Sequence, residues 1–416
     1  MRYYIIAGEA SGDLHASNLI KGLLECDPQA QFRFWGGDLM CAAAGDRGQL
    51  VRHYRDSAVM GLSDVLRSAG RLRRNIALCK RDLLAWQPDV VIPVDYPGFN
   101  MRIARFAHAH GLKVYWYIAP KTWASRERRN ETLRRCVDRL YIVFPFEIPY
   151  FESKGIPYIY KGNPLVDAVD GSTDTAPVVE GNYIAILAGS RKGEISRTLP
   201  ICIQAVEVLR SLPKYRDFKF VIAGAPSRDE EDYRSALDAG IDVIFGHTYS
   251  LLRHARAAVV NSGTASLEAA LLGTPQVVCW STSALTAFVA RKILRVMDHI
   301  KYISLGNLII DELAFTELVQ EDFNVDNVVL ELRSLVEDDT RRARMLAAYA
   351  RIRAALTAPV EGTGAGAGIS AGSAAPAGSP AAGAPLGSGA SQVSDTPRGS
   401  GASLAVARSI IHELTA

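Results

Sequence analysis

Short apolar runs alternate with amphipathic stretches along most of the chain, and this alternation is the strongest constraint on its fold. Strands that alternate with helices at this spacing indicate parallel sheets covered by helices on both faces. The alternation pauses at residues 170–180, a polar stretch with Gly and Pro that is typical of a hinge between domains. The predicted strands are 2–7, 31–35, 90–94, 113–117 and 139–144 before the hinge and 183–187, 218–223, 242–245, 257–260 and 276–280 after it. We therefore expect an α/β fold made of two Rossmann-like domains that face a cleft.

The last part of the chain differs in composition. Residues 358–402 consist almost entirely of Gly, Ala, Ser and Pro, which cannot bury a core, so we expect a disordered tether. A flexible coil of this length reaches on the order of 35 Å. Beyond it, Leu404, Ala407, Ile410 and Leu414 share one helical face and predict a final helix that docks back on the fold. The expected domains are 1–169, 170–357, the tether 358–402 and the helix 403–416.

Composition excludes several classes of protein. The net charge of +3 is too small to indicate nucleic acid, and no apolar run approaches the roughly 18 residues that span a bilayer. The apolar run at 3–7 is too short for a signal peptide, so we expect a cytoplasmic protein. Six cysteines are scattered without a CxxC pair, which indicates buried thiols and neither a metal site nor a disulfide framework.

Two turns in the second half of the chain are candidate phosphate-binding sites. Ser262, Gly263 and Thr264 lie between a predicted buried strand and a predicted helix. Such a turn points the first backbone N–H groups of the helix, and its positive dipole end, at open space. Glu268, one turn further on, could hold a ribose diol, although the same residues would also suit a simple helix cap. At 188–191 a second strand-to-helix loop offers Arg191, a forked donor for phosphate or an ordinary surface side chain. Two Rossmann-like halves with such sites in the second half resemble the GT-B glycosyltransferase fold.

Three loops should lie at the carboxyl edge of the first sheet: 8–13, 95–100 and 118–123. Asp95 follows its strand directly and could take a proton from a hydroxyl nucleophile, or could merely initiate a turn before Pro97. His15 is the rival base, but a lone histidine near a helix start is more often structural. Asp13 is expected to cap that same helix. The first loop has GxxxG where a dinucleotide site has GxGxxG, which argues against NAD.

Apolar and basic side chains mix in 58–84, 121–135 and 285–300. Cationic surface beside large apolar groups suits an anionic lipid, while an ordinary solvated helix face is the alternative. The residues assigned to this membrane or acceptor surface are Val59, Met60, Leu62, Leu66, Arg67, Arg71, Arg74, Trp123, Phe288, Arg291 and Lys292.

Nine motifs, in order, resemble those of the lipid-A-disaccharide synthase family. They are GEASGD (8–13), DYPGFN (95–100), YIAPKTWASR (117–126), FPFE (144–147), GNPL (162–165), AGSRKGEI (188–195), SGTASLEAAL (262–271), KYISLGN (301–307) and TELVQ (316–320). The match covers nearly everything except the tether. The family often has Pro at the positions of Ala188 and Gly306, His at that of Asn163 and Trp at that of Ser125, so details of cleft shape differ here.

The resemblance implies an inverting transfer of 2,3-diacylglucosamine from UDP to the 6-hydroxyl of 2,3-diacylglucosamine 1-phosphate, which gives a β(1→6) disaccharide and UDP. Asp95 would be the base. Arg191, Ser262, Gly263 and Thr264 would hold the diphosphate without a metal or other cofactor, and no convincing DxD is present. Glu268 would hold the ribose, and Asn307, from a loop, would line the cleft with Ser11 and Glu9.

Lipid substrates imply a peripheral association with the inner face of the cytoplasmic membrane, and a homodimer is compatible with the sequence. Whether His15 or Asp13 assists Asp95 stays open. The competing readings are a UDP-sugar epimerase, another GT-B enzyme with a soluble acceptor, and a non-catalytic nucleotide-sugar binding protein.

Overall fold

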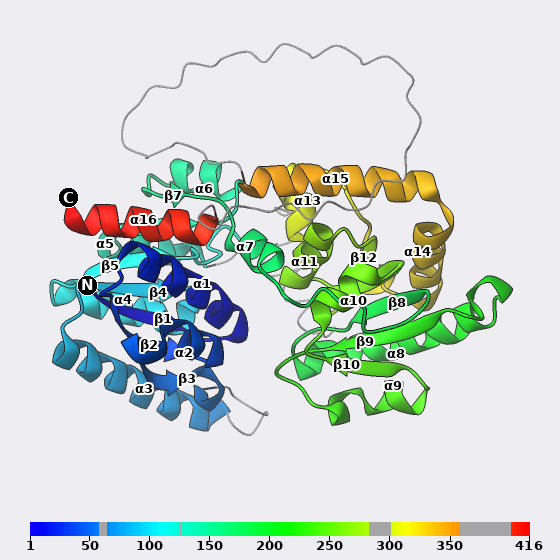
Figure 1. The fold of residues 1–416 in the computed structure, drawn as a ribbon, viewed down its shortest axis with the longest axis horizontal. Helices are drawn as coiled ribbons and strands as arrows, with labels where there is room; N and C mark the ends of the chain where they lie inside the picture. Colours follow the sequence, from blue (N-terminus) through cyan, green and yellow to red (C-terminus); the bar gives the residue numbers. More distant parts are fainter. Residues whose placement is uncertain (58–64, 125, 283–300, 358–400) are drawn as a thin grey trace, which may run out of the picture.

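Two parallel sheets form the molecule, each with helices on both faces (Figure 1). The computed structural model describes residues 1–57, 65–124, 126–282, 301–357 and 401–416. The first sheet has seven strands in the order β3-β2-β1-β4-β5-β6-β7, and the second has six in the order β10-β9-β8-β11-β12-β13. Every neighbouring pair is parallel. The expected α/β class with two Rossmann-like sheets is confirmed.

The strands of the first sheet are β1 (Arg2–Ala7), β2 (Gln31–Gly36), β3 (Gly48–His53), β4 (Val90–Val94), β5 (Lys113–Tyr117), β6 (Arg139–Ile142) and β7 (Ile159–Tyr160). Those of the second are β8 (Tyr183–Leu187), β9 (Lys219–Gly224), β10 (Asp242–Phe245), β11 (Ala257–Asn261), β12 (Gln276–Trp280) and β13 (Glu317–Val319). In the first half the helices are α1 (Ala10–Cys26), α2 (Asp38–Ala44), α3 (Val65–Trp86), α4 (Pro97–Ala109), α5 (Asn130–Cys136), α6 (Glu147–Ser153) and α7 (Pro164–Asp170). They continue with α8 (Lys192–Arg210), α9 (Arg234–Asp238), α10 (Thr248–His254), α11 (Thr264–Leu272), α13 (Leu305–Ile310), α14 (Val325–Glu337), α15 (Asp339–Thr357) and α16 (Ala402–Thr415).

The alternating faces of β1 explain why its sequence is apolar throughout. Tyr3 and Ile5 pack into a cluster that includes side chains of α1 and α16, while Tyr4 and Ile6 pack into a second cluster with α3 and α4 on the opposite face. A strand buried on both sides reads as a continuous apolar run. No described helix is long and apolar enough to cross a bilayer.

Strand order places a switch point in each sheet. In the first sheet the chain winds one way from β1 to β2 and β3, and the other way from β4 onward; in the second the same reversal separates β8 from β11. Loops that leave neighbouring strands in opposite directions open a crevice beyond the carboxyl ends, which is where such sheets bind ligands. The loops after β1 and β4, and those after β8 and β11, are therefore the positions to examine.

The first two loops are shorter than expected, which corrects the sequence prediction. Helix α1 begins at Ala10 and α4 begins at Pro97, so most of 8–13 and 95–100 is helical. Proline is favoured in the first turn of a helix because its missing N–H has no partner there. Asp13 does not cap α1; its carboxylate accepts hydrogen bonds from the backbone N–H groups of Gly37 (2.7 Å) and Met40 (3.2 Å), at the start of α2.

Helix α16 packs against α1 on the first sheet (Figure 1). Its start is capped by Asp167 of α7, whose carboxylate accepts hydrogen bonds from the backbone N–H groups of Ala402 (3.0 Å) and Ser403 (2.7 Å). The two helices meet at Gly22, where an added Cβ would lie 3.1 Å from Cβ of Ala407 and 3.2 Å from Cα of Leu404. The close approach depends on a glycine at position 22.

Replacing Gly22 by Leu should therefore undock α16. Overpacking of this kind costs about 1–3 kcal/mol, and here a backbone atom stands in the way, so relaxation is limited. We expect a lower denaturation midpoint and faster proteolytic loss of α16. Lys21→Leu, at an exposed position of the same helix, is the matched control. Equal midpoints for the two variants would contradict this packing.

Candidate active site

Asp95 lies at the switch point of the first sheet, immediately after β4. Asp95 and Tyr96 both have left-handed backbone conformations, with φ of 42° and 45°. This region is unfavourable for residues with a side chain, and such strain persists only where the surroundings enforce it. The fully buried Asn100 does so, because its amide donates hydrogen bonds to the backbone oxygens of Asp95 (2.8 Å) and Ile6 (3.3 Å). The strained turn is consistent with a functional role for Asp95.

The charges around Asp95 come from the neighbouring loops. Burial raises the pKa of the half-buried Asp95 carboxyl, Lys121 opposes that shift, and Glu9 adds to it. Arg129 also lowers the pKa. A carboxylate with a raised pKa is a better proton acceptor than an exposed one. The predicted site residues Glu9 and Ser11 are exposed at the start of α1.

His15 is poorly suited to act as the base. It is only 8% exposed, and burial lowers its pKa to about 4. Its Nδ1 is buried and has no hydrogen-bond partner among the described residues. The carboxylate of Asp13 is already engaged by the backbone N–H groups at the start of α2.

In the second sheet, the turn from β11 into α11 has the geometry of an anion-binding site. Gly263 is the N-terminal residue that flanks α11, and no side chain caps the helix there. A Cβ added at Gly263 would meet nothing within 4 Å, so the space beside the turn is open. The backbone N–H of Ser262 donates to the carbonyl of Cys279 (2.7 Å) and fixes the turn, and Thr264 is exposed. The first N–H groups of α11 are thus left for a ligand.

Glu268 lies one turn into α11 and is half-buried. Burial raises the pKa of its carboxyl, while a hydrogen bond donated by the hydroxyl of Tyr249 to Oε1 (3.1 Å) lowers it. Tyr249 thereby holds one carboxylate oxygen in a fixed orientation. This partner could not be predicted from the sequence, because Tyr249 belongs to another helix, α10.

The loop after β8 differs from the α11 turn because a carboxylate of the protein itself, that of Glu194, already occupies its backbone N–H groups. The backbone N–H groups of Ser190 (3.0 Å) and Arg191 (3.2 Å) donate to the carboxylate of Glu194, and the guanidinium of Arg191 pairs with the same carboxylate at 2.9 Å. What this loop can offer a ligand is therefore the Arg191 side chain, which is 71% exposed.

Asn307 does not reach out from a loop, and that expectation is wrong. It belongs to α13 and is fully buried, with its amide donating to the carbonyl of Phe315 (3.0 Å) and to the carboxylate of Glu317 (2.8 Å). Glu317 also accepts hydrogen bonds from the backbone N–H groups of Ile303 and Ser304. The carbonyl of Ile303 in turn accepts one from the hydroxyl of Ser262 (3.4 Å). Asn307 and Glu317 thus hold Ile303 in place, and Ile303 in turn contacts Ser262 at the turn before α11.

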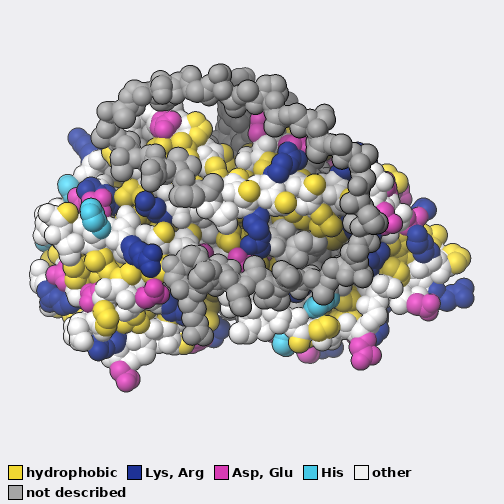
Figure 2. Space-filling model, turned by 45° about the horizontal axis from the view of Figure 1, so that its top comes forward, with side chains coloured by type: hydrophobic (Ala, Val, Ile, Leu, Met, Phe, Trp, Pro, Cys, Tyr) yellow, Lys and Arg dark blue, Asp and Glu magenta, His cyan; other side chains and the backbone are white. Residues whose placement is uncertain are grey.

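The predicted lipid surface is only partly described. Arg74 is exposed and Arg71 half-buried on α3. Trp123 is half-buried and lies edge-on to Phe146, with the ring centroids 5.0 Å apart. The side chains of Leu66 and Arg67, and the whole of Val59, Met60, Leu62, Phe288, Arg291 and Lys292, lie outside the described residues. On the face drawn in Figure 2, basic and acidic side chains are interspersed.

Glu147, in the FPFE motif, is a buried carboxyl that the sequence analysis did not single out. It is 1% exposed and accepts hydrogen bonds from the backbone N–H groups of Val143 (3.1 Å) and Phe144 (3.0 Å). Burial outweighs these bonds and raises its pKa from 4.5 to about 7. No group of three or more His, Cys, Asp and Glu side chains able to hold a metal ion occurs among the described residues.

Glu147 should make folding stability fall as pH rises from about 4.5 to about 7. In that window the folded protein binds the extra proton and the unfolded chain does not, so the stabilisation is complete below the unfolded pKa and lost through the folded one. The shift corresponds to about 3 kcal/mol. Glu147→Gln keeps an oxygen for the two N–H groups and should remove this slope in denaturant titrations at several pH values. Burial of His15 makes folding stability change with pH in the opposite direction, so the prediction concerns the difference in slope between Glu147→Gln and the unaltered protein. Identical slopes of stability against pH would contradict it.

The chain is similar to known proteins over most of its length. The family model for lipid-A-disaccharide synthetase matches residues 3–361. A lipid-A-disaccharide synthase of Geobacter metallireducens is 35% identical over 362 residues, which are 85% of this chain and 92% of the relative. One of Nitrosococcus oceani is 34% identical over 372 residues, 86% of this chain and 93% of the relative.

Solved structures share the fold at much lower identity. UDP-GlcNAc 2-epimerase from Neisseria meningitidis, bound to UDP-GlcNAc, is similar with a TM-score of 0.53 and 15% identity over 85% of this chain and 97% of that one. The glycosyltransferase of kitacinnamycin has a TM-score of 0.54 and 13% identity over 85% of this chain and 95% of that one.

Proposed function

The chain belongs to the lipid-A-disaccharide synthase family, and from this premise we propose which residues carry the reaction and how. The enzyme transfers 2,3-diacylglucosamine from UDP-2,3-diacylglucosamine to the 6-hydroxyl of 2,3-diacylglucosamine 1-phosphate. The observation that carries the assignment is the placement of the two candidate centres at switch points: Asp95 follows β4 beside β1, and the α11 turn follows β11 beside β8. One centre offers a base and the other an anion-binding site.

The proposed step is a single displacement with inversion. Asp95 accepts the proton of the acceptor 6-hydroxyl, whose oxygen attacks the anomeric carbon from the face opposite UDP. The bond from that carbon to the diphosphate oxygen breaks, and UDP leaves with the electron pair. The raised pKa of Asp95 suits it to take the proton, and its ionised form must be present in the ground state.

The leaving diphosphate is stabilised by donors that are already in place. The N–H groups at the start of α11 and the hydroxyls of Ser262 and Thr264 bind it, and Glu268 binds the ribose. Arg191 exchanges its ion pair with Glu194 for the phosphate, which needs only a rotation of an exposed side chain. Asn307 acts as a positioning residue through Glu317 and Ile303.

Product analysis tests inversion and metal independence together. The account predicts a β(1→6) linkage by NMR and unchanged turnover after dialysis against EDTA. An α-linked product would contradict the single displacement, and loss of turnover that Mg²⁺ restores would contradict stabilisation by protein donors alone.

Both substrates carry acyl chains, so we place the enzyme at the cytoplasmic face of the inner membrane as a peripheral protein. Exposed Arg74 on α3 supports an electrostatic contact with anionic lipid. Cosedimentation with vesicles should then be stronger for anionic than for neutral lipid and should weaken in salt; equal binding to both would refute it. A homodimer is also proposed; a monomeric mass by light scattering would refute it.

A further inference from the structure

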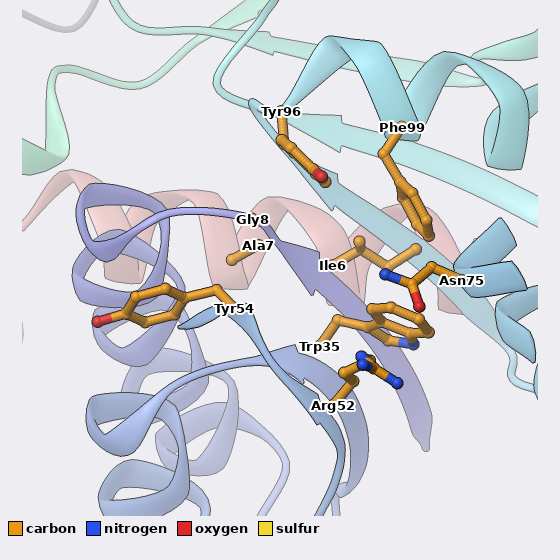
Figure 3. Close-up of a pocket in the computed structure, with 9 residues that line it drawn as sticks. All are labelled: Ile6, Ala7, Gly8, Trp35, Arg52, Tyr54, Asn75, Tyr96 and Phe99. Atoms are coloured by element: carbon orange, nitrogen blue, oxygen red, sulfur yellow. The ribbon is translucent and has the colours of Figure 1, made fainter. Parts of the chain in front are cut away.

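A small aromatic cavity, lined in part by Tyr96, the residue after Asp95, lies at the carboxyl edge of the first sheet (Figure 3). Its lining comes from the ends of β1 and β2, from β3 and the residue after it, from α3, and from the turn after β4 with the first turn of α4; Gly8, Arg52, Tyr96 and Phe99 are the residues that matter here. The free volume is about 10 Å³, which is about the minimum that a cavity needs to hold one water molecule. A larger group would therefore bind at its mouth.

Tyr96 connects this cavity to the base. A Cβ at Gly8 would lie 2.2 Å from Cγ of Tyr96, so the ring lies directly across the glycine. The ring also stacks on Phe99, with centroids 5.6 Å apart. Asp95 and Tyr96 form the same left-handed turn, so the residue next to the proposed base supplies an aromatic wall of the cavity.

Arg52 is the cation that lines this cavity, and among the described residues it has no anionic partner. Its Nε is buried and makes no hydrogen bond within the described part of the chain. Nearby arginines differ: Arg33 forms two hydrogen bonds with Asp82 (2.8 and 2.6 Å), and Arg55 lies 3.5 Å from Asp38. A buried cationic donor without a partner is costly unless an anion completes it.

We propose that Arg52 binds the 1-phosphate of the acceptor and so selects phosphorylated acceptors. This inference rests on the proposed function, because it takes Asp95 as the base at the 6-hydroxyl. The 1-phosphate is on C1 and the 6-hydroxyl is on the CH2 group of C5, and these two carbons flank the oxygen of the sugar ring, so both groups lie at one edge of it. A ring placed against Gly8 and Tyr96, with its 6-hydroxyl at Asp95, can direct the phosphate toward Arg52. Lys121 is a poorer candidate, because its charge acts on Asp95 itself.

The test compares two acceptors in detergent micelles: 2,3-diacylglucosamine 1-phosphate and the same lipid without phosphate. The unaltered enzyme should favour the phosphorylated acceptor by about 10- to 100-fold in kcat/KM, as expected for one charge-assisted hydrogen-bonding contact. Arg52→Gln should lose most of that preference through a higher KM for the phosphorylated acceptor, while its kcat with the acceptor lacking phosphate and its KM for the UDP-sugar stay unchanged. Arg52→Lys should recover part of it.

Arg55→Gln is the matched control, because it removes a neighbouring guanidinium that does not line the cavity. Equal losses of Arg52→Gln with both acceptors would show a structural role and overturn the proposal. An Arg52→Gln variant that keeps the preference for the phosphorylated acceptor would also overturn it. If that variant keeps the preference but binds anionic vesicles more weakly, Arg52 binds the phosphate of membrane lipids instead. Failure of the unaltered enzyme to release UDP with either acceptor would instead count against the proposed function.

Discussion

Replacing Asp95 by Asn lowers kcat by about 10²- to 10⁴-fold, the usual contribution of a positioned general base, and leaves UDP affinity unchanged. Asn has the same shape and can occupy the same left-handed turn, because Asn100 holds that turn through the backbone carbonyl of Asp95. The loss should therefore be chemical and not structural. It is measured as UDP release at saturating substrates, with UDP affinity determined by calorimetry.

The pH profile separates this role from a general disturbance. Because the pKa of Asp95 is raised, the acid limb of kcat/KM should lie above the ordinary range of an exposed aspartate, and it should be absent from the residual activity of Asp95→Asn. Asp46→Asn, an exposed carboxylate on the same domain, serves as the control. Turnover of Asp95→Asn within tenfold of the unaltered enzyme would exclude Asp95 as the base.

The second large effect is expected at Gly263. Its backbone is extended (φ 162°), and an added Cβ meets nothing within 4 Å, so Gly263→Val should fold normally. Valine is a poorer residue than glycine before a helix, which costs at most about 1 kcal/mol. The new side chain occupies the space in front of the α11 N–H groups, where the diphosphate is proposed to bind. Each charge-assisted hydrogen bond is worth about 1.5–3 kcal/mol, so UDP affinity should fall by about 10²-fold.

Gly70→Val is the matched control for this substitution. Gly70 is exposed on α3, and an added Cβ there also meets nothing within 4 Å. Its UDP affinity by calorimetry should equal that of the unaltered protein. Gly263→Val with unaltered UDP affinity would show that the open space beside α11 is not the diphosphate-binding site.

Sequence patterns predicted longer apolar strands well and short or exposed strands less well. β1, β4, β5, β8 and β12 match their predicted bounds because most of their residues are buried and apolar, and the edge strand β10 also matches. β3 was missed because it is a sheet edge whose residues are exposed or half-buried, and β7 and β13 have only two and three residues. α1 and α4 begin earlier than predicted because Gly and Pro in their first turns look like loop residues.

The same distinction holds for the candidate site. Asp95 and the Ser262–Thr264 turn could be found because each follows an apolar run in the sequence. Residues that act through contacts with distant parts of the chain could not be found in this way. Glu317 accepts hydrogen bonds from Asn307 and Ile303, and Arg52 borders a cavity formed by five separate segments. Asp13 was assigned to the wrong helix because its partners lie 24 to 27 residues away.

The most direct test of the account is UDP release from UDP-2,3-diacylglucosamine by the purified protein, with and without 2,3-diacylglucosamine 1-phosphate in detergent micelles. A transferase with Asp95 directed at an acceptor hydroxyl should release UDP only when the lipid phosphate is present, with one disaccharide formed per UDP. Release at the same rate without the acceptor, or binding of the UDP-sugar without release in either case, would contradict it.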